Sequence, residues 1–349
     1  MKTIHVYGAG LSGLTAALCL ARDGCRVKVF EREPRIGGSP QFHPSAHLTP
    51  MSFDSLQSYL GFAVADAFTP VSKFVAFVGD QAHELAPGPL HVVERGPREK
   101  SLDTYLYQMA LERGVEFHFG APLTKATLAQ APADSIISTG LHQDMFEALG
   151  VPQVTFDYYI YNGPTALPAS AYGYWDDYTS DYGYVAVANG MMLALVFCRY
   201  GLAENARDRF AQALKETIGV EIPQWLYYRG SNPVQPTFGR DRFILAGNLA
   251  GMWEPAFCFG IVGALFSGRL AAKAVADRAA ALKEFRRFTR FHSIMYKVPP
   301  LLAKVSWSAR RPGLNFLLEH PWLGAPGAWL INRSIPGYDG PNFIQKKRA

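Results

Sequence analysis

The hydrophobic and polar positions near the N-terminus follow first a strand pattern, then a helix pattern, then a strand pattern again. An apolar run over 3–7 predicts a strand that ends at Gly8, and a helical run opens across Gly13. A second apolar run, 27–30, predicts another strand and ends on Glu31. This order is typical of the first βαβ unit of a doubly wound sheet.

The same reading predicts elements further along the chain. The run 71–78 predicts a hairpin with the residues that follow it, and 184–197 predicts two strands about a turn. A helix is predicted near 206–218, a buried strand over 243–248 and a second helix from residue 261. The chain therefore has both a helix-rich part and a strand-rich part.

The first loop contains three glycines with the spacing Gly-x-Gly-x-x-Gly. Gly8 permits a tight turn, Gly10 lets the backbone approach a pyrophosphate, and Gly13 lets the helix lie close on the sheet. The helix N-terminus offers free N–H groups to the phosphate oxygens. Glu31 then stands where an acid accepts hydrogen bonds from a ribose. A glycine-rich turn before an ordinary crossover is the alternative, and the position of the acid favours dinucleotide binding.

A second group of residues, in the later part of the chain, also points to a cofactor site. The strand 243–248 ends in Gly247 and Asn248, a loop containing Pro255 and Cys258 follows, and a helix of small residues opens at Ile261. Together with the N-terminal motif, this resembles the FAD-containing superfamily that includes para-hydroxybenzoate hydroxylase, geranylgeranyl reductases and, more remotely, amine oxidases and phytoene desaturases. The resemblance implies an α/β fold with a discontinuous Rossmann-like FAD-binding domain, a mostly antiparallel β-sheet substrate domain and a C-terminal helical segment.

The resemblance also implies FAD as the cofactor. Asn248 stands where the family has an aspartate that binds the ribitol or pyrophosphate, and its amide still offers an acceptor. The helix from Ile261 would point its positive end at the flavin. The turn at Thr139 resembles one that passes under the pyrophosphate, with a plain strand end as the alternative. The predicted cofactor-binding residues are Gly8, Gly10, Leu11, Ser12, Gly13, Glu31, Arg32, Gly37, Gly38, Arg98, Thr139, Gly140, Gly247, Asn248, Pro255, Gly260, Ile261 and Val262.

The positions of these elements divide the chain into three parts. We expect an FAD-binding domain from 1–60, 95–150 and 235–280, a substrate domain from 61–94 and 151–234, and a C-terminal helical segment over 281–349.

Tyrosines are concentrated in the predicted substrate domain. Eight of the 17 tyrosines lie between 158 and 184. They predict either a pocket for a hydrophobic ligand with few polar groups, or merely the preference of tyrosine for strands. Cys258, in the loop before the flavin-facing helix, and Tyr172 and Tyr174 are the candidate catalytic proton donors; packing is the alternative role for the thiol.

The resemblance leaves the reaction open. Residues 138–142 lack the Asp-Gly pair of the family's hydroxylases, and the chain has no second Gly-x-Gly-x-x-Gly for a nicotinamide domain. We therefore expect hydride transfer at flavin N5 that reduces or dehydrogenates a C–C or C–N bond in a hydrophobic small molecule. The electrons would be exchanged with a partner protein or with transient NAD(P)H. A monooxygenase using NAD(P)H and O₂, and a non-redox cyclase or isomerase, are the alternatives.

Composition and cysteine usage agree with a cytoplasmic enzyme. The chain has 349 residues, 49% of them hydrophobic, and no run of uninterrupted apolar residues long enough for a membrane span. Its four cysteines have neither paired nor metal-ligand spacing, so no metal is predicted. His43 and His47 are four residues apart on a proline-bounded stretch, and we interpret them as ordinary loop histidines.

The segment 283–311 is strongly basic, with eight basic residues against one acidic. Phenylalanines recur among them at helical spacing. Such a helix can lie on an anionic membrane surface. Alternatively, it packs its phenylalanines on the enzyme and exposes only its charges. Nothing in the sequence predicts nucleic-acid binding.

Overall fold

The computed structural model describes residues 2–199, 201–320, 323, 335 and 337. Its first sheet has the order β15-β16-β9-β1-β2-β8 and is parallel except for the antiparallel pair β15–β16. Five of these strands form the predicted doubly wound core. The strands are β1 (Thr3–Tyr7), β2 (Arg26–Phe30), β8 (Glu116–His118), β9 (Ile136–Ile137), β15 (Gly239–Arg240) and β16 (Phe243–Leu245).

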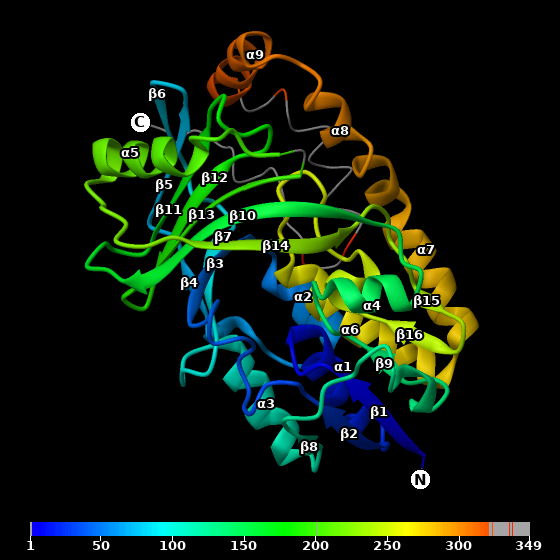
Figure 1. Cartoon of the computed structure of the whole chain (residues 1–349). Helices are drawn as coiled ribbons and strands as arrows, with labels where there is room; N and C mark the ends of the chain where they lie inside the picture. The colour runs from blue at the N-terminus through cyan, green and yellow to red at the C-terminus, as the bar shows by residue number, and fades with distance from the viewer. Residues whose placement is uncertain (1, 200, 321–322, 324–334, 336, 338–349) are drawn as a thin grey trace.

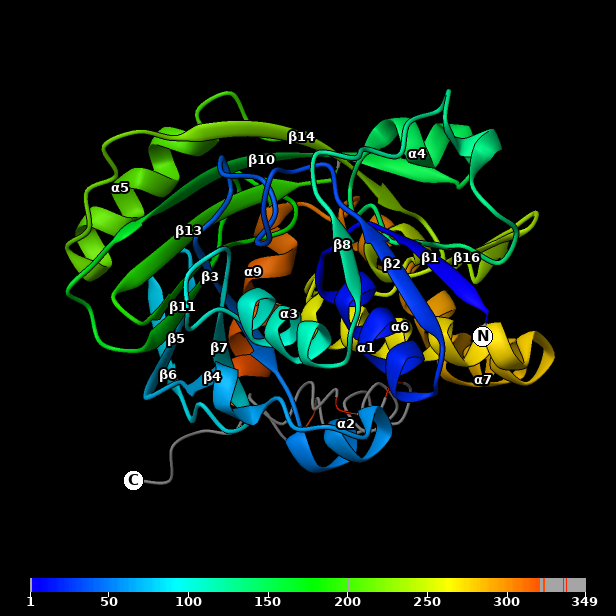
Figure 2. The same ribbon diagram turned by 90° about the horizontal axis from the view of Figure 1, so that it is seen from below.

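Helices surround this sheet. The helix α1 packs against both α3 and α6 (Figure 2), and all three share one hydrophobic core with β1, β2 and β16. These α/β elements confirm the Rossmann-like part of the predicted fold. The helices of this part are α1 (Leu11–Arg22), α2 (Phe53–Leu60), α3 (Leu102–Glu112), α4 (Gln143–Ala148) and α6 (Ile261–Ala276), with short 3₁₀ turns at Ala65–Ala67, Leu128–Gln130 and Gly247–Ala250.

A second sheet of seven strands lies across the molecule from the first (Figure 1). Its order is β14-β10-β13-β12-β11-β5-β6, antiparallel except where β11 and β5 run parallel. The helix α5 (Ala206–Ile218) covers one face. The strands are β5 (Lys73–Val78), β6 (Gln81–Leu85), β10 (Gln153–Pro164), β11 (Ser170–Trp175), β12 (Gly183–Ala188), β13 (Met191–Cys198) and β14 (Leu226–Pro233).

A small third sheet has the order β3-β7-β4 and comprises β3 (Ser45–Pro50), β7 (Leu90–Arg95) and β4 (Phe68–Pro70). It joins strands from both sides of the domain boundary predicted at residue 60. The division into domains stays a prediction, since one sheet spans that boundary.

The described part of the predicted C-terminal segment is helical. It consists of α7 (Arg278–Met295), α8 (Val298–Leu302) and α9 (Trp307–Glu319), which follow one outer edge of the molecule (Figure 1). Apart from 323, 335 and 337, the predicted segment beyond 320 lies outside the described residues. Within the described chain, no helix combines the length and the apolar character needed to cross a bilayer.

Candidate functional site

The glycines of the first loop have different local surroundings. Gly8 has φ of +101°, and an added Cβ would collide with the backbone of Ser138. At Gly13 a Cβ would collide with the carbonyl of Gly8, so this glycine brings α1 close to the turn. At Gly10 a Cβ would meet nothing within 4 Å. Packing of the protein itself therefore does not require glycine at position 10, whereas it does at 8 and 13.

The acid at the end of β2 closes this loop. Glu31 is buried, and it accepts hydrogen bonds from the backbone N–H of Ala9 (2.6 Å) and of Glu33 (3.0 Å), one on each carboxylate oxygen. The carboxylate thereby ties the glycine loop to the end of β2. Each oxygen keeps a second lone pair for another donor.

The middle of α6 packs against the start of α1, and the starts of both helices line the second cavity. Gly268 on α6 lies directly against the backbone of Ser12, where no side chain fits, and Gly247 lies against the Ser12 hydroxyl. Ser267 Oγ accepts a hydrogen bond from the Gly247 N–H (2.8 Å). Two helix N-termini, with their positive dipole ends, therefore line the same cavity as Asn248.

Two adjoining cavities lie between the sheets. The first, of about 380 Å³, is lined by the glycine loop, the ends of β1 and β2, the segment 138–142 and part of the seven-stranded sheet. The second, of about 280 Å³, is lined by the starts of α1 and α6, by the loop before α6 and by aromatic side chains of the seven-stranded sheet. Residues lining both cavities are Gly10, His47, Arg95, Ser138, Gly140, Leu141, Tyr158, Leu195 and Asn248.

Most of the predicted site residues line these cavities. The first cavity has Gly8, Gly10, Glu31, Arg32, Gly38, Thr139, Gly140 and Asn248 in its wall, and the second has Gly10, Leu11, Ser12, Gly140, Gly247, Asn248, Cys258, Gly260 and Ile261. The predicted residues that line neither cavity are Gly13, Gly37, Arg98, Pro255, Val262, Tyr172 and Tyr174.

The predicted role of Arg98 needs correction. Its guanidinium forms an ion pair with Glu94 (3.1 Å) and donates to the carbonyl of Asn189, away from both cavities. Arg95, at the end of β7, lines both cavities instead. It forms two hydrogen bonds, of 2.7 and 2.9 Å, to the buried carboxylate of Asp103. The arginine in the cavity wall is therefore Arg95, three residues before the predicted one.

Tyr172 and Tyr174 are also placed differently from the prediction. Both lie on the face of the seven-stranded sheet that α5 covers, and the Tyr174 hydroxyl lies 2.8 Å from Thr217 Oγ1. Successive side chains of a strand point to opposite faces. On β11 the even-numbered positions therefore face α5, while Tyr184 on the neighbouring strand faces the cavity. Of the tyrosines between 158 and 184, those that line a cavity are Tyr158, Tyr182 and Tyr184.

A hydrogen-bonded chain that the sequence analysis did not predict forms part of the wall. Ser45 Oγ lies 2.7 Å from His43 Nδ1 and 2.8 Å from His47 Nε2. Its hydroxyl therefore donates to one ring and accepts from the other. Desolvation, followed by the nearby Arg95 charge, lowers the pKa of His43 to about 4 and that of His47 to about 3, so both rings are neutral at pH 7. His43 lies in a loop, as interpreted, but the same interpretation is wrong for His47, which lies on β3.

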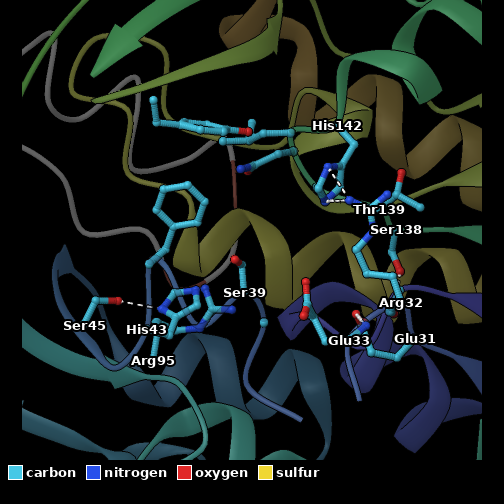
Figure 3. A pocket seen from close by; sticks show the side chains of 18 of the residues that line it. Glu31, Arg32, Glu33, Ser39, His43, Ser45, Arg95, Ser138, Thr139 and His142 are labelled. Atoms are coloured by element: carbon cyan, nitrogen blue, oxygen red, sulfur yellow. Dashed lines mark hydrogen bonds between the residues drawn. The ribbon is translucent and has the colours of Figure 1, made fainter. Parts of the chain in front are cut away.

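Figure 3 shows how these groups face one another across the first cavity. His43, Ser45 and Arg95 lie on one side, and Glu31 and the segment 138–142 lie on the other. An Arg32 guanidinium nitrogen lies 2.9 Å from His142 Nδ1, just beyond the C-terminal end of β2. The first cavity is therefore polar at the end nearest β2.

Comparison with known proteins agrees with this geometry. Residues 6–47 match the NAD(P)-binding Rossmann-like domain. Over 64 residues the chain is 40% identical to flavin-containing monooxygenase FMO GS-OX2 of Arabidopsis thaliana, a match that spans 18% of this chain and 14% of that protein. A geranylgeranyl bacteriochlorophyll reductase-like protein of Thermoplasma acidophilum superimposes with a TM-score of 0.69 at 16% identity, over 88% of this chain and 90% of the other. The chain has the fold of the FAD-dependent oxidoreductases.

Oxygenases share this flavoenzyme fold. The p-nitrophenol 4-monooxygenase PnpA of Pseudomonas putida superimposes with a TM-score of 0.61 at 18% identity over the whole of both chains. A 2-methyl-3-hydroxypyridine-5-carboxylic acid oxygenase does so with a TM-score of 0.60 at 15% identity, over 87% of this chain and 93% of the other. The fold is thus common to a reductase-like protein and to oxygenases.

The first cavity and its rim fit a bound FAD. The space beside Gly10 has room that no protein atom fills, and Thr139 Oγ1 is buried without a hydrogen-bond partner among the described residues. Together with the two helix N-termini, these features form an anion-binding cradle with spare hydrogen-bonding capacity.

The loop before α6 has a distinct conformation. Cys258, in the wall of the second cavity, has φ of +60°, which is uncommon for a residue other than glycine. Side-chain hydrogen bonds hold the loop in place. The Glu254 carboxylate accepts a hydrogen bond from the N–H of Phe257 (2.5 Å), and the Tyr182 hydroxyl donates to the carbonyl of the same residue. Arg199 donates to the carbonyl of Pro255 (2.9 Å). Pro255 therefore contributes to the site through the loop rather than by lining it.

Two groups of this loop have shifted pKa values. Burial raises the pKa of the Cys258 thiol, although the Arg199 guanidinium, 3.3 Å from the sulfur, acts in the opposite direction. Burial also raises the pKa of Glu254 to about 7, against the effect of its backbone hydrogen bonds. Cys258 is thus a protonated thiol at neutral pH and not a nucleophilic thiolate.

Proposed function

We propose that this protein binds FAD in the two adjoining cavities and reduces or dehydrogenates a hydrophobic small molecule beside the aromatic side chains of the second. The observation that carries the proposal is the junction of the two cavities. A cavity built on the dinucleotide loop opens, at Gly10 and Asn248, into one whose wall includes the aromatic side chains of Tyr182, Tyr184, Phe197, Trp253, Phe257 and Phe259. Such a lining suits an apolar ligand, whose few polar groups are oriented by a few fixed side chains.

Residues of this chain would hold the cofactor as follows. The backbone N–H groups at the starts of α1 and α6 favour the negative charges of a pyrophosphate and of a reduced ring. Glu31 keeps lone pairs free for ribose hydroxyl groups, and Asn248 adds an amide. When bound, FAD supplies the acceptor or donor of a hydride.

The proton that accompanies a hydride would come from the wall of the second cavity. The Cys258 thiol is protonated at neutral pH and faces this cavity. Arg199 and the bonds of its loop fix the position of that thiol. Tyr182 and Tyr184 hold their protons as well, because burial raises the pKa of both hydroxyls. The aromatic lining would exclude water from the reacting atoms.

A monooxygenase reaction with NAD(P)H and O₂ is the second candidate. It is favoured by the two oxygenases whose chains superimpose on most or all of this one. The first candidate is favoured by the higher superposition score of the reductase-like protein. The mass of the product distinguishes the two: reduction or dehydrogenation changes it by two hydrogens, hydroxylation adds one oxygen atom.

The first experiment is the absorption spectrum of the purified protein, followed by anaerobic titration with NADPH and then exposure to air. Flavin bands that NADPH bleaches and air restores slowly would support a reductase with a nicotinamide donor. Rapid reoxidation in air would support the monooxygenase. Bands that only dithionite bleaches would indicate an electron-donor protein or a dehydrogenase reduced by its substrate. A colourless protein that takes up no added FAD would refute the proposal.

A further inference from the structure

Exposed large apolar side chains are concentrated near the end of the described chain. Among the described residues, ten large hydrophobic side chains are exposed, and seven of them lie between 294 and 323: Ile294, Leu301, Leu302, Val305, Phe316, Leu317 and Leu323. Leu301 is 62% and Leu302 51% exposed. A single exposed leucine needs no explanation, but such a concentration marks a site of contact.

The phenylalanines of α7 do not belong to this exposed set. Phe285 is buried against Phe238, and Phe288 contacts Phe266 and Tyr59 at ring-centroid distances of 5.1 and 6.4 Å. The apolar face of α7 thus packs on the enzyme. Of the two alternatives predicted for this helix, membrane contact or packing of its phenylalanines on the enzyme, the structure agrees with the second. The unpartnered apolar surface begins only at its last turn and continues through α8.

The same segment carries only positive charge. No Asp or Glu occurs between residues 285 and 318, which include seven Lys and Arg residues. Lys297 and Lys304 are exposed, flank α8, and form no ion pair with any described residue. We call the segment 294–305, with its exposed Ile294, Leu301, Leu302 and Val305 and these two lysines, the α8 surface.

We propose that the α8 surface binds the headgroup region of an anionic lipid membrane. Exposed leucines beside lysines are the composition of interfacial membrane anchors, in which apolar groups enter the acyl boundary and cations meet lipid phosphates. A second copy of this chain would bring like charges together, so charge complementarity favours lipid over self-association. The surface also adjoins the site, because Tyr296 donates to the carbonyl of Gly251 (2.9 Å) and its ring lies 6.3 Å from that of Trp253.

The test is co-sedimentation of the full chain with vesicles of phosphatidylcholine mixed with phosphatidylglycerol, and with vesicles of phosphatidylcholine alone. We expect binding to the anionic vesicles that falls with added salt. The double variants Leu301→Asp/Leu302→Asp and Lys297→Glu/Lys304→Glu should each lower the partition coefficient about tenfold or more. The control is Leu111→Asp, on α3, whose leucine is 41% exposed outside the surface; it should bind as the wild type does.

Thermal unfolding and size-exclusion chromatography of each variant complete the experiment. All three should keep the melting temperature of the wild type, because the altered side chains are exposed. Absence of binding to anionic vesicles, or equal binding by wild type and the leucine variant, would overturn the proposal. If the wild type elutes as a dimer and the leucine variant as a monomer, the surface would instead bind a second copy of the chain. The vesicle assay requires no catalysis, so its result is independent of the proposed redox function.

Discussion

The ion pair between Arg95 and Asp103 offers a quantitative test of the site's construction. The Asp103 side chain is 1% exposed and that of Arg95 18%, and the carboxylate also accepts the N–H of Gly96 (3.0 Å). Asp103→Ala leaves a guanidinium in the cavity wall without its counter-charge. Removal of one partner from a buried pair costs about 3–5 kcal/mol. For a protein of this size we expect the melting temperature to fall by roughly 4–7 °C.

Asp157→Ala provides the matched control. Asp157 also accepts two hydrogen bonds from one guanidinium, that of Arg229, at 2.8 and 3.4 Å. Here, however, the arginine is 62% exposed, and exposed pairs contribute about 1 kcal/mol or less. The control should therefore lower the melting temperature by at most about 2 °C. Circular dichroism during heating measures both. Equal shifts in the two variants would refute the claim that burial makes the first pair important.

Three further predictions concern the site. Gly10→Val should leave the melting temperature of the apoprotein nearly unchanged, because the added side chain meets no protein atom. It should weaken FAD binding about tenfold or more in a fluorescence titration, because the side chain would occupy space proposed for the cofactor. Gly8→Ala should instead lower the melting temperature, because its Cβ collides with the backbone of Ser138 at a positive φ. Tyr182→Phe and Tyr174→Phe each remove one buried hydrogen bond, about 1 kcal/mol in thermal unfolding, but only Tyr182→Phe should also raise KM for the substrate. Burial raises the pKa of Glu254 in the folded protein to about 7, so the folded protein keeps a proton that the unfolded chain releases above pH 4.5. The free energy of unfolding therefore falls as the pH rises from about 4.5 to 7. Glu254→Gln should reduce the drop in melting temperature between pH 5 and pH 8.

Much of the framework could be predicted from the sequence because its signals are local. The glycine spacing and the apolar runs predict β1, α1 and β2, and helical spacing predicts α5 and the start of α6. Which arginine lines the cavities could not be predicted from such local signals. Arg95 and Arg98 are three residues apart, and only the end of the short strand β7 determines that the first of them faces the site. Nothing in the sequence near these arginines marks that strand end.

The orientation of the tyrosines could not be predicted for a different reason. Strands with one solvated face alternate apolar and polar residues, which reveals the inner face. The central strands of the seven-stranded sheet are covered on both sides, by α5 on one face and by the remaining protein around the cavity on the other. Tyr172 and Tyr184 therefore have similar sequence surroundings, although they face opposite sides. A shift of one residue in register would exchange these roles.

Charged side chains are fewer in the second cavity than in the first. The ionisable residues lining the second cavity are His47, Arg95, Tyr158, Tyr182, Tyr184 and Cys258. Burial raises the pKa of the three phenols and of the thiol and lowers that of the imidazole, so all five are neutral at pH 7. The sixth, Arg95, has its charge balanced by Asp103. An apolar ligand in the second cavity would therefore bury no unpaired charge, and the proposed proton donors there would be neutral phenols and a neutral thiol. Glu31 and Glu33 line the first cavity with the glycine loop, where the hydroxyl groups of a dinucleotide would find acceptors.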